Sequence, residues 1–142
     1  MANKLKHHVT NANLVSTSDM YSRIISNIGD VNFLIDLKGK ILTINLPNKN
    51  INKNLNSWLH KNIFDFLTIE SKEKLDMQIT SLSEINKFST KGFELNHISS
   101  ETGEFPIRYK GFKTEDKKNI ILIGNDLSQI AEIQKKLSLI HI

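Results

Sequence analysis

The feature that most constrains the fold is a run of four apolar residues near the end of the chain. Residues 120–123 read Ile-Ile-Leu-Ile, so three of the four side chains are β-branched. An uninterrupted apolar run of this length and composition is typical of a central strand that is covered on both faces. The run therefore predicts a buried strand over residues 119–125, with a sheet built around it.

A short amphipathic helix is predicted directly after this strand. Polar residues at 124–126 end the run, and Asp126 or Ser128 can accept hydrogen bonds from free N–H groups of the next turn. A helix of about ten residues is marginal alone in water, so residues 127–136 are predicted to connect the domain to a partner surface. The residues expected to transfer a signal or to form a dimer interface are Asp126, Leu127, Ser128, Ile130, Ile133 and Gln134.

The last six residues have a different predicted origin. Residues 137–142 (LSLIHI) match one reading frame of a common transposase sequencing adapter, and we predict that they are a sequencing-adapter scar. In that case the natural sequence continues beyond Lys136. The alternative is a genuine C-terminus that extends the helix.

Composition limits the class of function. With 142 residues, 39% of them apolar, the chain fits one domain with a core of ordinary size. Its net charge of +4 comes from scattered lysines, and the only arginines are Arg23 and Arg108. Because phosphate clamps and base readout favour arginine, DNA contact is expected only through a downstream domain that lies outside this sequence.

Several kinds of chemistry are excluded or disfavoured. The absence of cysteine excludes disulfides, thiolate catalysis, Cys-ligated zinc and a cysteinyl-flavin adduct. No phosphate loop, HExxH motif or dinucleotide turn is present, so an enzyme is not predicted. Neither a secretion signal nor a membrane span is visible, and the expected location is the cytoplasm.

Periodicity and turn residues predict the order of the elements. Residues 1–17 read as a flexible arm, and residues 18–29 as a helix that begins at Ser18, stops at Gly29 and packs or pairs. The remaining predicted elements are a hairpin over residues 31–46 that turns at Gly39, helical turns over 58–67, a helix over 68–87, and strands over 88–98, 105–113 and 119–125. This order predicts an α+β fold, in which a five-stranded antiparallel sheet carries helices on one face.

Two residues are weak candidates for holding a cofactor. His97 shares a strand face with Phe93 and Leu95, where a lone imidazole can ligate haem iron, although a buried histidine with one hydrogen bond is commoner. Trp58, with Phe64 and Phe66, can line a pocket or fill it, and packing is favoured. No cofactor is predicted, because nothing in the sequence supports haem or flavin.

The front and back of the predicted sheet resemble a PAS domain. Residues 33–41 (FLIDLKGKI) are similar to its first strand and Asp-x-x-Gly turn, and Asp126-Leu-Ser resembles the element that joins the last strand to the signalling helix. The resemblance covers residues 18–136 and places the domain at 18–126. It implies a PAS fold, a sensory role, and a homodimer or higher homo-oligomer formed through the N-terminal and C-terminal helices.

Within that family, several pieces are similar to the N-terminal PAS domain of the PpsR/CrtJ photosynthesis-gene repressors. They are Trp58 and residues 68–74 (TIESKEK), 94–97 (ELNH), 105–109 (FPIRY) and 124–134 (GNDLSQIAEIQ). The resemblance implies a transcriptional regulator with its DNA-binding domain further along. Asn125 departs from the arginine usual in that family, and no cysteine is available for a thiol switch.

Two other functional readings stay open. The same domain can serve as the sensor of a histidine kinase or of a cyclic-dinucleotide enzyme, whose output would differ only downstream. It can also be a stand-alone module for protein association.

Overall fold

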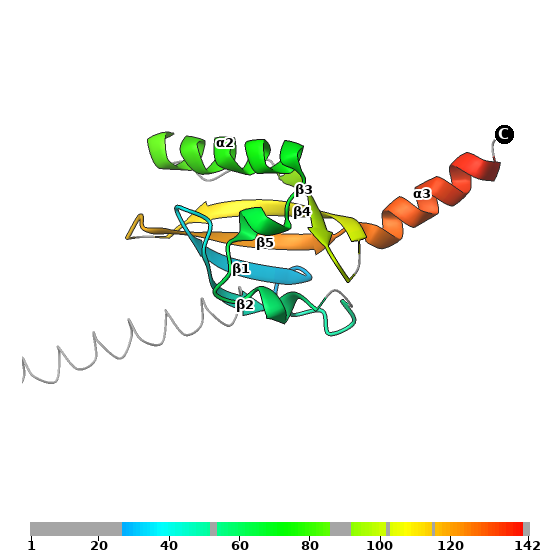
Figure 1. Ribbon diagram of the computed structural model, residues 1–142, viewed down its shortest axis with the longest axis horizontal. Coiled ribbons are helices and arrows are strands. Elements are labelled where there is room, and N and C mark those ends of the chain that lie inside the picture. Colours follow the sequence, from blue (N-terminus) through cyan, green and yellow to red (C-terminus); the bar gives the residue numbers. More distant parts are fainter. Residues whose placement is uncertain (1–26, 52–53, 86–91, 102, 115, 141–142) are drawn as a thin grey trace, which may run out of the picture.

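Five antiparallel strands form one sheet in the computed structural model, which describes residues 27–51, 54–85, 92–101, 103–114 and 116–140. The strands lie in the order β2-β1-β5-β4-β3 (Figure 1). Their bounds are β1 Val31–Asp36, β2 Ile41–Asn45, β3 Phe93–Ser99, β4 Gly103–Lys113 and β5 Asn119–Asp126. The helical elements are η1 Leu55–Trp58, η2 Ile63–Phe66, α2 Ile69–Ile85 and α3 Ser128–Ile140. The predicted α+β architecture is confirmed.

Some predictions lie outside the described residues. These are the arm at 1–17 and nearly all of the helix predicted over 18–29. Gly29 itself is described, and its φ of 74° is the left-handed conformation expected of a helix stop.

The central strand was predicted correctly, but its environment only in part. β5 pairs with β1 on one side and β4 on the other. Ile120 and Leu122 are buried, whereas Ile121 and Ile123 are half-buried on the opposite face. Ile120 and Leu122 belong to the core that the sheet forms with η1, η2 and α2, so the described residues bury the two faces of β5 to different degrees.

The third predicted strand begins later than expected. It was predicted over residues 88–98, but β3 starts at Phe93 and residues 86–91 lie outside the described part of the chain. Within β3, Phe93, Leu95 and His97 are buried, which confirms the alternation that placed them on one face.

Polar groups at the start of α2 attach this helix to the edge of the sheet. The Thr68 hydroxyl accepts a hydrogen bond from Ser71 N, as expected of a helix start. Ser71 is bonded to the sheet, because its buried hydroxyl accepts a bond from Asn96 N in β3. Thr68 N also donates to Asn96 O. These bonds satisfy β3 backbone groups that an edge strand would otherwise leave unpaired.

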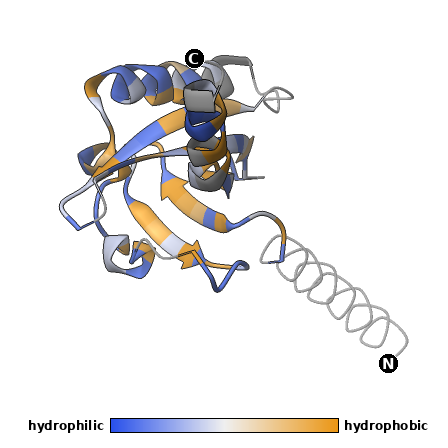
Figure 2. Ribbon diagram, turned by 90° about the vertical axis from the view of Figure 1, so that its right-hand side faces the viewer, coloured by the Kyte–Doolittle hydropathy of each residue, from blue (hydrophilic) through white to orange (hydrophobic). Residues whose placement is uncertain are grey.

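The core lies between the sheet and the helices that cover it. Its buried members come from all five strands, from η1, η2 and α2, and from Leu67. Figure 2 shows hydrophobic residues concentrated in the strands and hydrophilic residues along much of α2. Within the described ranges, no helix is both long and apolar enough to cross a bilayer.

The last helix leaves the body of the fold. α3 follows β5 and points away from the sheet (Figure 1), and its residues Ile130 and Ile133 are 53% and 56% exposed. It extends to Ile140, beyond the predicted boundary at 136. The apolar face that the sequence predicted on this helix is therefore available for contact.

Comparison of Gly39, in the turn of the first hairpin, with Gly103, at the start of β4, separates the effect of backbone conformation from that of packing. Gly39 has a φ of 95°, and a Cβ there would lie 2.6 Å from the Phe64 ring, whereas Gly103 has a φ of 72° and no atom within 4 Å of that position. Gly103→Ala should cost about 1–2 kcal/mol through its left-handed backbone. Gly39→Ala should cost about 1–3 kcal/mol more, because it also overpacks the core. Urea unfolding of both variants measures the difference, and equal losses would contradict the packing explanation.

Candidate functional site

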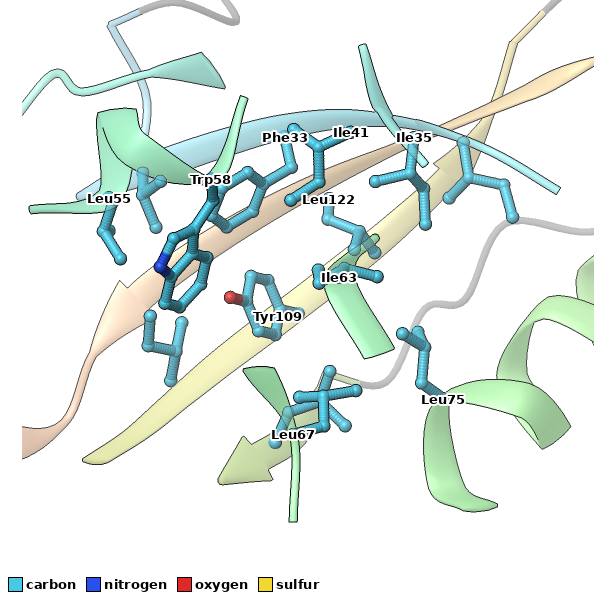
Figure 3. Packing of buried hydrophobic residues seen from close by; sticks show 14 of the residues in the cluster. Phe33, Ile35, Ile41, Leu55, Trp58, Ile63, Leu67, Leu75, Tyr109 and Leu122 are labelled. Atoms are coloured by element: carbon cyan, nitrogen blue, oxygen red, sulfur yellow. The ribbon is translucent and has the colours of Figure 1, made fainter. Parts of the chain in front are cut away.

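Six rings pack together between the sheet and the short helices. We call this set the aromatic cluster, and its members are Phe33, Trp58, Phe66, His97, Phe105 and Tyr109. The Trp58 indole stacks on Phe66 with ring centres 4.3 Å apart and on Phe33 at 6.0 Å. Figure 3 shows Phe33, Trp58 and Tyr109 among the buried side chains of the core, and the Phe33 ring lies 6.0 Å from Trp58 and 6.3 Å from Tyr109 between ring centres. The packing role predicted for Trp58 therefore agrees with the geometry.

His97 is held by two hydrogen bonds inside the cluster. Its Nδ1 lies 2.9 Å from Phe66 O, and its Nε2 lies 2.5 Å from the Tyr109 hydroxyl. Because a carbonyl oxygen only accepts, Nδ1 carries the proton in the neutral ring and Nε2 accepts from Tyr109. His97 is 0% exposed, so the network ties η2 to β3 and β4 from within.

Burial shifts the titration of both partners toward their neutral forms. Desolvation lowers the pKa of His97 from 6.5 to about 4, against an opposing effect of the hydrogen bond to Phe66. Desolvation also raises the pKa of Tyr109 well above 10, and the negative charge of Asp126 adds to this increase. At neutral pH both side chains are uncharged, and the hydrogen bond runs from a phenol to an imidazole.

The arrangement does not suit a haem or a flavin. Ligation of haem iron by Nε2 would require His97 to give up its bond to Tyr109, and Nδ1 is occupied by Phe66 O. A planar flavin would have to displace the Trp58–Phe66 stack. No group of three or more His, Cys, Asp or Glu side chains suited to a metal ion occurs in the described part of the chain.

Tyr109 connects the cluster to the last strand. It pairs in register with Gly124 of β5, and a Cβ at Gly124 would lie 2.7 Å from the Tyr109 ring. Only glycine lets the ring lie this close to the β5 backbone. The Tyr109 ring therefore touches the strand two residues before Asp126.

Asp126 joins β5 to α3, as predicted. Its Oδ1 accepts from Ser128 N at 3.0 Å and from the Ser128 hydroxyl at 2.6 Å. The next amide, Leu127 N, donates to Pro106 O in β4 at 3.0 Å. We call residues 124–128 the hinge, because their side-chain and backbone bonds set the direction in which α3 begins.

The hinge has a further support that sequence reasoning missed. Asp126 N donates to Asp30 Oδ2 at 2.7 Å, and Asn48 Nδ2 donates to Asp30 Oδ1 at 3.1 Å. Asp30 N in turn donates to Gly124 O. Asp30 thus ties the entry to β1, the loop after β2 and the exit from β5. An acidic residue between Gly29 and the first strand was its only sequence signal.

The remaining predicted residues fall outside these contacts. Ile130, Ile133 and Gln134 are exposed on α3 and lie away from the aromatic cluster. His60 is exposed and has a left-handed backbone conformation. Sequence reasoning found His97 and Trp58 but missed Tyr109. In the sequence, Tyr109 looks like any other core aromatic residue of an alternating strand. Only its pairing with Gly124 in the structure distinguishes it.

The fold is similar to solved PAS domains. A PAS domain of an HTR-like protein from Haloarcula marismortui is 16% identical, with a TM-score of 0.58 over 84% of this chain and 98% of that chain. A PAS domain from Colwellia psychrerythraea is 12% identical, with a TM-score of 0.60 over 80% of this chain and 98% of that one. The RpfR quorum-sensing receptor PAS domain of Cronobacter turicensis, solved in complex with BDSF, is 15% identical, with a TM-score of 0.54 over 68% and 92%.

No protein-family model and no curated protein matches the sequence. At these identities the structural similarity shows the fold alone, and the predicted PAS fold is confirmed. The finer resemblance to the PpsR/CrtJ repressors stays a prediction.

The buried histidine makes stability depend on pH. The unfolded chain binds a proton near pH 6.5 that the folded chain binds only near 4, so stability is full above 6.5 and falls as the pH falls toward 4. At about 1.4 kcal/mol for each tenfold change in proton concentration, this loss reaches about 3 kcal/mol. Urea unfolding at several pH values should show it in the wild type and in the exposed control His60→Gln, but not in His97→Gln. An equal pH dependence in His97→Gln would exclude His97 as its source.

Proposed function

We propose that this domain is a non-catalytic sensory and self-association module, and that it passes a packing change from the aromatic cluster into α3. The observation that carries the proposal is the continuous set of contacts from His97 through Tyr109 to Gly124 and the hinge. These contacts therefore reach from the buried core to the first residues of α3, which points away from it. The PAS fold supports a sensory role, and the RpfR domain is one receptor with this fold.

The mechanism is a shift between two arrangements of α3. A signal acts only through the difference in its affinity for the two, and coupling free energies of this kind are about 1–3 kcal/mol. Asp30 and Pro106 each hold one hinge amide, so a small displacement of β4 or of the β1 entry changes the start of α3. The hinge has two stable arrangements when the bonds to Asp30 and Pro106 break and form together.

The partner in self-association is a second copy of the chain. Ile130 and Ile133 lie three residues apart on α3 and are both more than half exposed. This spacing continues a stripe that two parallel helices can bury against each other. Leu137, 49% exposed, extends the stripe but lies in the predicted scar, so the proposal rests on the two isoleucines.

The output is proposed to be transcriptional. The resemblance to PpsR/CrtJ repressors favours a DNA-binding domain downstream of the connector helix, and the described surface need not contact DNA itself. The sensor of a histidine kinase or of a cyclic-dinucleotide enzyme remains the alternative, since α3 would serve either output in the same way. A stand-alone association module is the third reading.

Replacement of Ile133 tests self-association through α3. Ile133→Gln should weaken it by about tenfold or more, because each copy loses about 1.5–3 kcal/mol of apolar burial. The control Lys135→Gln changes an exposed residue of the same helix and should leave the dissociation constant unchanged. Sedimentation velocity over a concentration series measures both. Identical behaviour of Ile133→Gln and the wild type would exclude this interface.

A further inference from the structure

Three side chains of the aromatic cluster are joined in series by ring contacts. The Trp58 indole lies 5.1 Å from the His97 ring between ring centres, and the His97 ring lies 5.6 Å from that of Tyr109. Phe33 also lies against both Trp58 and Tyr109 (Figure 3). An electron that passes between the indole and the phenol therefore crosses only one intervening side chain. Electron transfer over so short a path is fast.

The Tyr109 phenol has a base at hydrogen-bond distance. Loss of an electron turns a phenol into a strong acid, so oxidation of a tyrosine requires a group that takes the hydroxyl proton. Nε2 of neutral His97 lies 2.5 Å from the Tyr109 oxygen and accepts its hydrogen bond. Both side chains are 0% exposed. The acceptor for the proton is therefore built into the core.

The surroundings of His97 suit the proton that it would receive. Burial lowers the pKa of His97 to about 4, yet such an imidazole is still a much stronger base than an oxidised phenol. Nδ1 donates to Phe66 O at 2.9 Å, and this bond favours the doubly protonated ring. The negative charge of Asp126, which acts on Tyr109, offsets the positive charge that proton transfer leaves in this pair.

The sequence leaves few competing sites for oxidation. It contains no cysteine, one tryptophan and two tyrosines, Tyr21 and Tyr109. Trp58 is 2% exposed, whereas His97 and Tyr109 are 0% exposed, so an oxidant in solution reaches the indole first. A phenoxyl radical that has lost its proton is more stable at neutral pH than an oxidised indole. Oxidation that begins at Trp58 is therefore expected to end at Tyr109.

We propose that Trp58, His97 and Tyr109 form a path for proton-coupled electron transfer from the edge of the core to its interior. A one-electron oxidant, an oxygen- or nitrogen-centred radical, takes one electron from Trp58 and is reduced. The Trp58 radical cation then takes one electron from Tyr109, while the Tyr109 O–H bond breaks and its proton forms an N–H bond at Nε2 of His97. The products are intact Trp58, an imidazolium at His97 and a neutral phenoxyl radical at Tyr109.

This activity goes beyond the proposed sensory function and does not depend on it. Neither the hinge nor self-association of α3 takes part in the electron transfer. After the step, Nε2 of His97 donates a hydrogen bond to the phenoxyl oxygen, so the contact between the two side chains persists with donor and acceptor exchanged. Because the proton stays at hydrogen-bond distance, its transfer is reversible.

Pulse radiolysis in azide solution tests the path. The azidyl radical is a one-electron oxidant that attacks tryptophan in preference to tyrosine at neutral pH. The indole radical absorbs green light and the phenoxyl radical violet light, so transient absorption separates them. In a Tyr21→Phe background every phenoxyl radical comes from Tyr109. There the indole band should decay, and the phenoxyl band should grow, with one rate constant that is independent of protein concentration.

Matched variants in the same background assign the two transfers. Tyr109→Phe should abolish the phenoxyl band. His97→Gln should slow its growth about a hundredfold, the lower end of what a positioned base contributes. His60→Gln, which changes an exposed histidine, should react like the background. Circular dichroism at neutral pH establishes that each variant is folded.

The proton transfer has a second test that needs no substitution of His97. In fully exchanged D2O the growth of the phenoxyl band should be slower, because the O–H bond breaks in the same step. Absence of phenoxyl growth, or a rate that rises in proportion to protein concentration, would overturn the path. An equal rate in D2O and H2O, or an unchanged rate in folded His97→Gln, would exclude His97 as the proton acceptor.

Discussion

The hydrogen bond from the Tyr109 hydroxyl to Nε2 of His97 joins β3 to β4 inside the aromatic cluster. Both groups are fully buried, so loss of either partner would leave a polar atom without a bond in a dry interior. The bond holds the Tyr109 ring against Gly124, where no side chain intervenes. Gly124 lies two residues before Asp126, and the bonds of Asp126 and its neighbours set the direction in which α3 begins.

The hinge combines a rigid side with an adjustable one. On the rigid side, β5 is paired with β1 and β4 along most of its length. On the adjustable side, among the described residues, the Asp126 amide donates to Asp30 Oδ2 alone and the Leu127 amide to Pro106 O alone. Loss of the bond to Pro106 O costs about 0.5–1.5 kcal/mol, and loss of the charge-assisted bond to Asp30 about 1.5–3 kcal/mol. Both are comparable to the coupling free energy that the proposed function requires. The architecture therefore places a few single hydrogen bonds at the start of α3 and extensive strand pairing behind them.

The sequence predicted the sheet well because its signals were local. The apolar run at 120–123, the glycine turn at Gly39 and the alternation around His97 each act within a few residues, and all three appear in the structure. Asp30 and Tyr109 were missed because their importance arises from partners 96 and 15 residues away, Asp126 and Gly124. Ile121 and Ile123 are less buried than Ile120 and Leu122, a difference between the two faces of β5 that hydrophobicity alone does not show.

Hydrogen exchange at the hinge amides in Tyr109→Phe tests the central claim most directly. This substitution keeps the ring and removes the hydroxyl, so the bond to His97 is lost while most of the packing remains. The account predicts faster exchange of the Asp126 and Leu127 amides than in the wild type, with Ile120 at the far end of β5 changed much less. Unchanged exchange at Asp126 and Leu127, or equal acceleration along all of β5, would show that the aromatic cluster does not communicate with α3.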